Sequence, residues 1–349
     1  MADLENIIEM AAQNRASDIH LTEGNRTVFR VDGQLTEAPV CLSEEETRKA
    51  ILSVLDEKEQ ERLFAGQDID VSFETGRGRR LRVNVFWQQK KLAATLRLFP
   101  ERIPLLDELS LPEKIGKLAE EPRGLILVTG PTGSGKSTTL AAMIEQMNRS
   151  RSLHIITIED PIEYVYEGKK ALIHQREVGQ DVPDFSGALR SALREDPDII
   201  LVGEMRDYET ISAALTAAET GHLVLSTLHT TGTAQTVDRI IDACPAGSQN
   251  QIRTQLAGVL KAVITQCLLP LRSGSGRIAG TEILLGTDAV SNMIRENKTH
   301  QIQSVMQSGA ALGMHTLNMD LIRLVREKKI TMQTAVNYTN DRKDLEQYI

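Results

Sequence analysis

The chain has 349 residues and a formal net charge of −8, and 41% of its residues are hydrophobic and 25% charged. This balance is typical of a globular protein with room for two domains, and the negative charge argues against general nucleic-acid binding. The longest apolar runs are far shorter than the ~20 residues of a membrane span, and three scattered cysteines favour neither a disulfide framework nor a cysteine zinc site. Because the N-terminus is also acidic and amphipathic, unlike a signal peptide, we expect a cytoplasmic protein with no transmembrane segment.

Residues 1–100 predict a domain of mixed helix and strand. A helical stretch comes first, and strand patterns separated by Gly- and Asp-containing turns follow at residues 17–24, 28–35, 68–74 and 79–87. Residues 100–114 contain three prolines, which predicts a linker.

Two arginines stand out in residues 79–98. If Gln89-Lys90 forms the turn of a hairpin, Arg82 lies opposite Arg97, although this turn lacks the usual Asn-Gly or Asp-Gly pair. Like charges directly opposite each other on a sheet repel. An anion between them, such as a nucleotide γ-phosphate, would relieve the repulsion; the alternative is a pair of arginines on a solvated strand face.

From Gly124 the pattern changes to apolar strands that alternate with helices. Strands are predicted at 124–130, 153–159, 198–204 and 222–228, and helices at 136–148, 184–196 and 207–221. This alternation predicts an α/β fold with a mostly parallel sheet covered by helices. Beyond residues 284–296 the pattern is helical to near the end of the chain.

Residues 130–137 read GPTGSGKS, which matches the phosphate-binding pattern G-x-x-x-x-G-K-[ST] between a strand and a helix. Its glycines let backbone N–H groups surround phosphate oxygens, and the helix N-terminus favours negative charge. Lys136 is expected to reach the β- and γ-phosphates and Ser137 to bind Mg²⁺. A Gly/Ser-rich surface turn is the weaker alternative. The predicted nucleotide-binding residues are Gly130, Thr132, Gly133, Ser134, Gly135, Lys136, Ser137 and Thr138.

Two carboxylates follow predicted strands, Glu163 after ITIEDPI and Glu204 after IILVG. The C-terminal ends of parallel strands share one edge of a sheet, so both can face the phosphates. Hydrolysis needs such a group to orient water. Acidic residues also gather at strand ends simply because loops are solvated.

His222 and His229 bracket a predicted strand. Seven residues span about 23 Å on a straight strand, and the odd separation sends the two side chains to opposite faces, so they are not joint ligands of one metal. We expect His229 at the phosphate edge, near Glu204, and His222 at the opposite end. The alternative for both is an imidazole satisfied by nearby backbone.

The segments GPTGSGKST, ITIEDPIEY, REDPDIILVGEMRD and AAETGHLVLSTLHT, in this order, resemble the secretion-ATPase superfamily and, within it, the type IV pilus retraction ATPase (PilT) family. The resemblance covers essentially the whole chain, including ASDIHLTEG, FRVDGQL and HQREVGQD. It implies a hexameric ring whose subunits join a PAS-like α+β domain to a RecA-like P-loop ATPase core. The expected divisions are a PAS-like domain at 1–100, a linker and entry to the core at 101–122, the core at 123–286 and a helical C-terminal region at 287–349.

The resemblance also implies roles for single residues. Glu163 would be the general base, and Glu204 would support Mg²⁺ and the attacking water. Arg82 and Arg97 would be arginine fingers, and His222 and His229 would contribute to nucleotide sensing and subunit contact. The implied protein is a cytoplasmic motor that hydrolyses ATP at the inner face of the cytoplasmic membrane, where it powers pilus retraction through a platform protein at the pilus base.

Two other functions remain open at this point. Pilus-assembly and type II secretion ATPases belong to the same superfamily but are usually longer and carry a four-cysteine zinc element. A DNA-dependent ATPase of the RecA or helicase type fits the acidic balance poorly. The retraction family carries AIRNLIRE where residues 289–296 read AVSNMIRE, so Ser291 replaces an arginine, and the direction of pilus movement is not determined by these residues.

Overall fold

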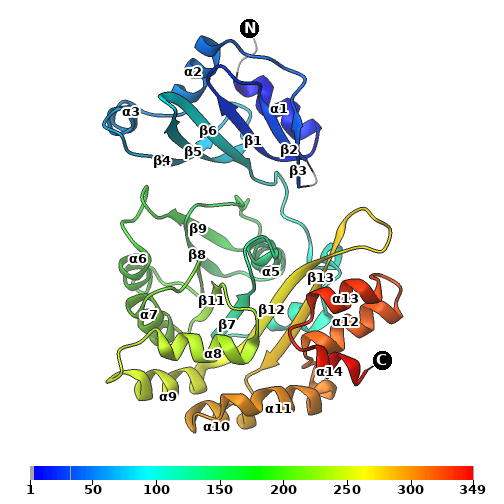
Figure 1. Ribbon diagram of the computed structural model, residues 1–349. Coiled ribbons are helices and arrows are strands. Elements are labelled where there is room, and N and C mark those ends of the chain that lie inside the picture. The colour runs from blue at the N-terminus through cyan, green and yellow to red at the C-terminus, as the bar shows by residue number, and fades with distance from the viewer. Residues whose placement is uncertain (1–3, 32, 349) are drawn as a thin grey trace. The chain divides into compact units, whose positions relative to one another are not determined.

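The computed structural model describes residues 4–31 and 33–348. This part of the chain divides into two compact units between Arg102 and Ile103, and each is described by itself (Figure 1). Among the described helices, none is long and apolar enough to cross a membrane.

The first unit is an antiparallel sheet with three helices among its described residues. The strand order is β3-β2-β1-β6-β5-β4, and one face buries apolar side chains such as Ile19, Leu96 and Val83 with residues of the helices. The elements are α1 (Leu4–Gln13), β1 (Ala16–Thr22), β2 (Val28–Val31), β3 (Gln34–Glu37), α2 (Glu44–Leu52), α3 (Glu57–Phe64), β4 (Ile69–Glu74), β5 (Arg80–Gln88) and β6 (Lys91–Leu98).

The β5–β6 hairpin confirms the predicted register. Gln88 pairs with Lys91, and Arg82 lies directly opposite Arg97. Gln89 and Lys90 have φ values of 48° and 65°, which is the left-handed backbone that a two-residue type I′ turn requires. The turn therefore forms without the residues that adopt this conformation most easily.

Two expectations for the first unit were wrong or incomplete. The single strand expected at 28–35 is two strands, β2 and β3, which pair with each other. The helices α2 and α3 were not predicted, although each begins with a capping box that the sequence displays, Ser43 with Glu46 and Asp56 with Glu59.

The second unit is built on a sheet of order β13-β12-β7-β11-β10-β8-β9. All neighbouring pairs are parallel except β12 with β13, so the predicted mostly parallel sheet is confirmed. Its strands are β7 (Gly124–Thr129), β8 (His154–Glu159), β9 (Leu172–Glu177), β10 (Ile199–Val202), β11 (Leu223–Leu228), β12 (Leu260–Pro270) and β13 (Arg277–Leu285).

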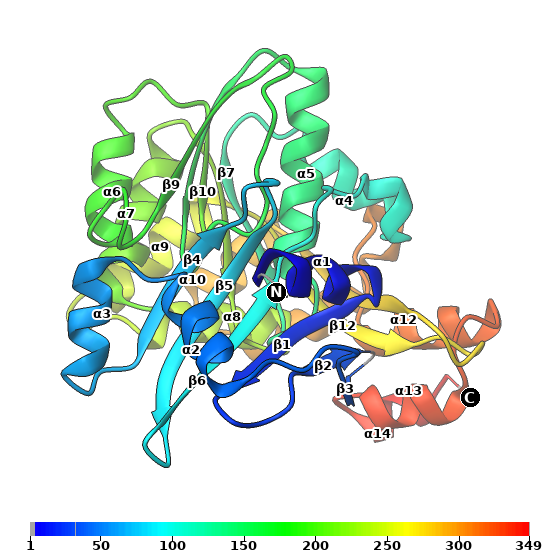
Figure 2. The same ribbon diagram turned by 90° about the horizontal axis from the view of Figure 1, so that it is seen from above.

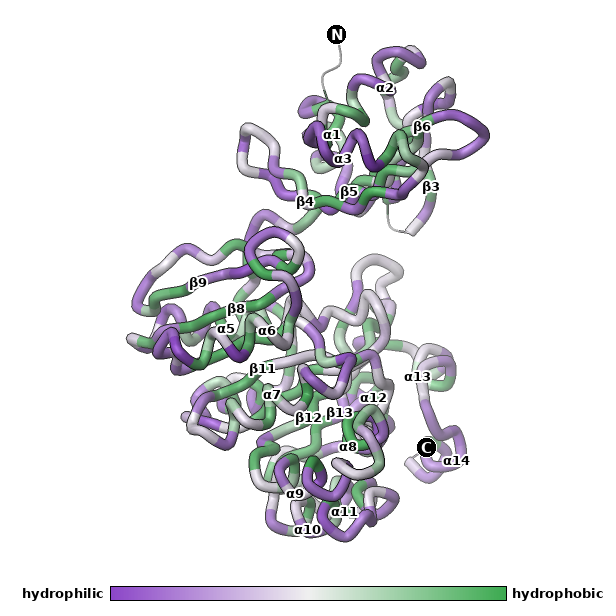
Figure 3. The backbone as a smooth tube through the Cα atoms, turned by 90° about the vertical axis from the view of Figure 1, so that its left-hand side faces the viewer, coloured by the Kyte–Doolittle hydropathy of each residue, from purple (hydrophilic) through white to green (hydrophobic). Residues whose placement is uncertain are grey.

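Helices cover both faces of this sheet, with α6 and α7 on one face and α5 on the other (Figure 2). The central strands are wholly buried, whereas β9 lies at an edge and carries polar residues (Figure 3). The helices are α4 (Glu113–Leu118), α5 (Lys136–Ser150), α6 (Phe185–Ala192), α7 (Tyr208–Glu219), α8 (Thr233–Asp242), α9 (Gln249–Val259), α10 (Asp288–Arg295), α11 (Ile302–Ser308), α12 (Leu317–Arg326), α13 (Met332–Tyr338) and α14 (Arg342–Glu346).

Part of the segment predicted as a linker is folded into the second unit. Leu106–Leu109 form a 3₁₀ helix, and Ile115 and Leu118 of α4 are buried in the same core as β7. Proline content alone was misleading, because the apolar residues between the prolines pack. The C-terminal residues are helical as predicted, and Val290, Met293 and Ile294 of α10 turn one face toward the core.

Candidate active site

The loop between β7 and α5 is shaped by glycine. Gly130, Gly133 and Gly135 have φ values of 141°, 76° and 90°, which L side chains rarely adopt. A Cβ at Gly130 would also lie 2.2 Å from the carbonyl oxygen of Gln266. Because α5 begins after Gly135 without a side-chain cap, its first N–H groups remain available to an anion.

Gln266 of β12 braces this loop from behind. Its Nε2 donates to the Ser134 carbonyl (2.8 Å), and its Oε1 accepts from Thr139 Oγ1 (3.0 Å). The residue is buried in a mostly apolar strand. Sequence reasoning missed Gln266, although a lone amide within LKAVITQCLLP was a signal, since a buried polar group needs partners.

Lys136 lies at the start of α5 and donates to the carbonyl oxygens of Gly130 (2.8 Å) and Pro131 (3.1 Å). Burial lowers its pKa, and the negative charges of Glu163 and Glu204 act in the opposite direction. Both carboxylates therefore act on the lysine of the phosphate loop. This follows from the topology, because β8 and β10 are parallel neighbours and each carboxylate follows one of them.

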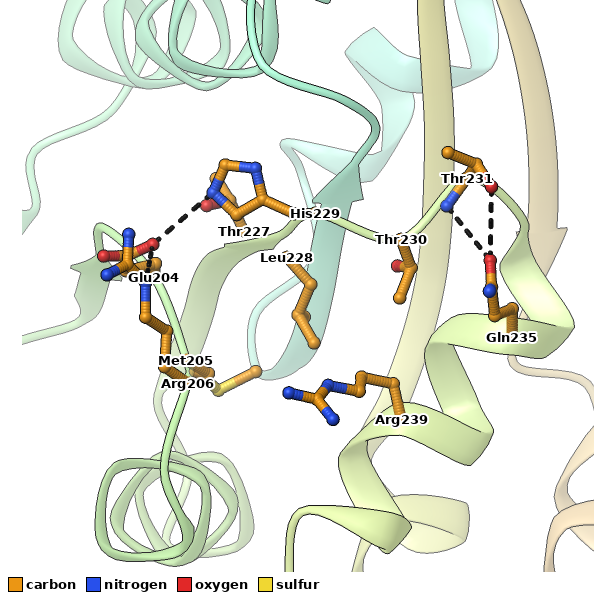
Figure 4. Close-up of a pocket in the computed structure, with 10 residues that line it drawn as sticks. All are labelled: Glu204, Met205, Arg206, Thr227, Leu228, His229, Thr230, Thr231, Gln235 and Arg239. Carbon is orange, nitrogen blue, oxygen red and sulfur yellow. Dashed lines mark hydrogen bonds and ion pairs between the residues drawn. The ribbon is translucent and has the colours of Figure 1, made fainter.

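Glu204 lies between two basic side chains. Its Oε2 contacts Arg206 Nε at 2.7 Å and His229 Nε2 at 3.5 Å. His229 directly follows β11, the neighbour of β10, so the structure brings it to Glu204 (Figure 4). The pocket beside them has a volume of about 420 Å³ and is lined by Glu204, Met205, Arg206, Thr227, Leu228, His229, Thr230, Thr231, Gln235 and Arg239.

Two residues of α8 in this lining, Gln235 and Arg239, were not predicted. Val237, Ile240 and Ile241 of the helix are buried, whereas Gln235 and Arg239 are exposed one turn apart. Arg239 makes no ion pair within residues 4–31 and 33–348 and extends into the pocket (Figure 4). The sequence feature that could have indicated these pocket residues is an arginine four residues after a glutamine on the polar face of an amphipathic helix.

His222 precedes β11 at the end opposite to His229. Its Nδ1 lies 2.9 Å from the Ala217 carbonyl and 3.2 Å from Thr220 Oγ1. These contacts match the alternative of an imidazole satisfied by nearby backbone.

Arg82 and Arg97 belong to the first unit, where carboxylates lie beside them. Arg82 forms an ion pair with Asp70, and Arg97 Nε donates to Asp18 Oδ1 at 2.9 Å. Asp18 is buried, and Arg30 lies on its other side at 3.9 Å. The arginine pair that the register creates is thus neutralised within the unit by aspartates of the flanking strands.

A parallel sheet whose strand β7 leads through a glycine-rich loop into a helix, with two acidic strand ends acting on the loop lysine, defines a P-loop ATPase core. Residues 1–347 match the family model described as type II/IV secretion system protein, and the chain belongs to this family. The expected fold, a RecA-like core with a smaller N-terminal domain, and the expected ATP hydrolase class are confirmed.

Individual relatives match over nearly their whole length. The chain is 47% identical over 334 residues to the type IV pilus retraction ATPase PilT of Pseudomonas aeruginosa, covering 95% of this chain and 97% of the relative. It is 49% identical over 328 residues to a twitching motility protein of Neisseria gonorrhoeae, covering 92% and 88%. A crystal structure of the pilus retraction motor PilT with bound ADP superposes with a TM-score of 0.90 at 48% identity, covering 99% of this chain and 98% of that one.

Proposed function

We propose that the protein is a cytoplasmic ATPase motor that retracts type IV pili. The observation that carries this proposal is the similarity to the retraction ATPase PilT over 97% of the relative's length. Type II secretion relatives are less similar: the chain is 38% identical to protein E of Pseudomonas aeruginosa and covers 57% of it. This difference favours retraction over secretion.

The chemistry is hydrolysis of ATP at the phosphate loop. Lys136 exchanges its loop carbonyls for β- and γ-phosphate oxygens, and N–H groups from Gly133 to Thr138 hold the remaining oxygens. Glu163 accepts the proton of the attacking water, and Glu204 supports placement of that water, with His229 beside it as a γ-phosphate sensor. The effect of the negative charges of Glu163 and Glu204 on the pKa of Lys136 supports a place for both carboxylates near the phosphate loop.

The oxygen atoms of Ser137 and Glu204 suit Mg²⁺, which prefers oxygen ligands and keeps several waters and substrate phosphates as its other partners. No group of three or more His, Cys, Asp or Glu side chains that could hold a metal occurs within the described residues, which fits an ion that arrives with the nucleotide. Bound there, Mg²⁺ would neutralise charge on the phosphates.

Two arginines of the first unit couple ATP hydrolysis to movement of the domains. Arg82 and Arg97 leave Asp70 and Asp18 for the γ-phosphate when the site closes, and they return after hydrolysis, which turns charge neutralisation into rigid-body domain movement. We place this site between subunits of a homohexameric ring, with His222 at the subunit contact. The ring acts on a platform protein of the pilus base at the inner face of the cytoplasmic membrane.

The test is deletion of the gene followed by counting of surface pili. Excess pili that do not retract are expected, and the wild-type gene, but not a Lys136→Ala gene, should restore normal numbers. Absence of pili after deletion would instead identify an assembly ATPase. Unchanged pili together with impaired protein export would identify a secretion ATPase.

A further inference from the structure

Glu163 lies in residues 160–171, which connect β8 to β9 without helix or strand. A group that takes part in catalysis must be held within about 0.5 Å of its working position, and loops hold side chains less precisely than helices or strands. The contacts that fix this loop therefore affect any role of Glu163.

Side chains of β9 hold the main chain on both sides of Glu163. Ahead of it, the N–H of Ile162 donates to Glu177 Oε2 at 3.1 Å. After it, the Gln175 amide makes two bonds to the loop: Nε2 donates to the Tyr164 carbonyl (2.8 Å) and Oε1 accepts from the Tyr166 N–H (2.9 Å). Nε2 also donates to Glu159 Oε1 at the end of β8 (3.2 Å). The strand that runs beside β8 thus fixes the peptide groups that flank the carboxylate.

Tyr164 connects the same loop to the phosphate-binding helix. Its hydroxyl lies 3.0 Å from Thr138 Oγ1, in the first turn of α5 and two residues after Lys136. The ring is buried in the core of the second unit, 5% exposed. Burial also raises the pKa of the hydroxyl, so the group stays protonated and able to donate at neutral pH.

The far end of the loop is attached to the same helix. Asn148, near the end of α5, donates from Nδ2 to the Glu167 carbonyl (2.8 Å) and accepts at Oδ1 from the Lys169 N–H (2.9 Å). With Tyr164 at one end of α5 and Asn148 at the other, a displacement of the helix carries the Glu163 loop with it.

We propose that Tyr164 is a positioning residue for ATP hydrolysis, whose hydroxyl, through Thr138, sets the distance between Glu163 and the phosphates held by Lys136. This inference rests on the proposed role of Glu163 as the general base. A purely packing role for Tyr164 requires the ring but not the hydroxyl. The two roles therefore separate in a Tyr164→Phe variant.

Tyr166 supplies a matched control in the same loop. It is also buried, 9% exposed, and within the described chain its hydroxyl makes no hydrogen bond. Tyr164→Phe and Tyr166→Phe thus remove the same atom from the same kind of surrounding. For the full-length protein we expect Tyr164→Phe to lower kcat for ATP by roughly 10- to 100-fold, as small misplacements of reacting groups do, whereas Tyr166→Phe stays within about twofold of wild type.

The experiment measures phosphate release at varied ATP, affinity for a fluorescent ADP analogue, and thermal melting. Tyr164→Phe should change KM and ADP affinity by less than about threefold, because the phosphate contacts remain. Gln175→Met, which removes both amide bonds to the loop together with the bond to Glu159 at similar volume, should show the same loss of kcat at a similar KM.

Three results would overturn the inference. The first is equal kcat for the two Phe variants, while Glu163→Gln is inactive; this result leaves the proposed role of Glu163 intact. The second is a Tyr164→Phe effect confined to KM and ADP affinity, which would assign the hydroxyl to nucleotide binding. The third is wild-type turnover by Glu163→Gln, which removes the general base itself and the inference with it.

Discussion

In the proposed mechanism, Lys136 and Glu204 are the residues on which turnover depends most directly. We expect Lys136→Ala and Glu204→Ala each to lower phosphate release at least about 100-fold, since each would remove a charge that the proposed mechanism places at the transferring phosphate. Lys117→Ala is the control, because Lys117 is exposed and pairs with Glu113 on the surface of α4. Such a surface ion pair contributes little to the free energy of folding. Wild-type rates from either site variant would refute the site.

Arg97 tests the proposed exchange between aspartate and phosphate. Removing an arginine that stabilises a phosphoryl transition state costs a factor of about 10³ or more, so Arg97→Gln should reduce kcat by at least about 100-fold. Arg26→Gln is the matched control, since Arg26 is an exposed arginine of the same unit that pairs with Glu37. Similar rates of ATP hydrolysis for the two variants in single-turnover measurements would exclude Arg97 from the reaction.

At the scale of elements, the β5–β6 hairpin can be stabilised by changing its turn. Gln89 and Lys90 adopt positive φ angles that Asn and Gly adopt at lower cost. Replacing the pair by Asn-Gly should stabilise the hairpin by about 1 kcal/mol and slow hydrogen exchange of the β5 and β6 amides about fivefold. The same pair placed at Lys58-Glu59, inside α3, should destabilise the first unit. Unchanged exchange in the hairpin variant would contradict the turn geometry.

The elements that the sequence predicted correctly are those with strong local signals. The buried strands β7, β8, β10 and β11 read as apolar runs because helices cover both faces of their sheet. β9 was missed because its side chains His174, Gln175 and Glu177 are polar, and two of them serve the neighbouring loop rather than the core. The hairpin of β12 and β13 was missed although its pattern is apolar and its two strands follow each other in the chain. Only the pairing of β12 with β7 joins segments distant in sequence.

The residues of the candidate site also divide into those with a local sequence signal and those without one. The phosphate loop could be predicted because its spacing lies within eight consecutive residues. Gln266, Arg239 and Gln175 were missed, because the fold rather than nearby sequence brings them to the phosphate loop, to the pocket and to the peptide groups that follow Glu163. The aspartate partners of Arg82 and Arg97 were equally hidden, although the register that makes them necessary was predicted.

For the molecule as a whole, unfolding should respond to acid through His315. Burial lowers the pKa of His315, Asp320 and Glu282 oppose this effect, and Arg323 reinforces it; Thr281 Oγ1 lies 2.9 Å from Nε2. Below the usual histidine pKa of about 6.5, the unfolded chain therefore binds more protons than the folded one. The free energy of unfolding that is present above that pH is lost as the pH falls toward the pKa of His315 in the folded protein.

The measurement is the urea midpoint at pH 7.5 and pH 5.5. The urea midpoint of the wild type should be lower at pH 5.5 than at pH 7.5. His315→Gln, which keeps a hydrogen-bonding group toward Thr281, should show a smaller decrease. His300→Gln, at an exposed histidine, should behave as wild type. An identical pH dependence for the His315 and His300 variants would show that His315 carries none of it.

The bonds from Lys136 to the carbonyls of Gly130 and Pro131 bear on which members of the adenylate pool the enzyme accepts. The ammonium has three N–H donors, so a phosphate can accept from the third or take the place of a carbonyl, and it keeps the buried charge hydrogen-bonded. ADP and ATP offer a β-phosphate within reach of Lys136, whereas the single phosphate of AMP lies one position short. We therefore expect the loop to bind AMP more weakly than ADP or ATP, so that AMP competes poorly with either for the enzyme.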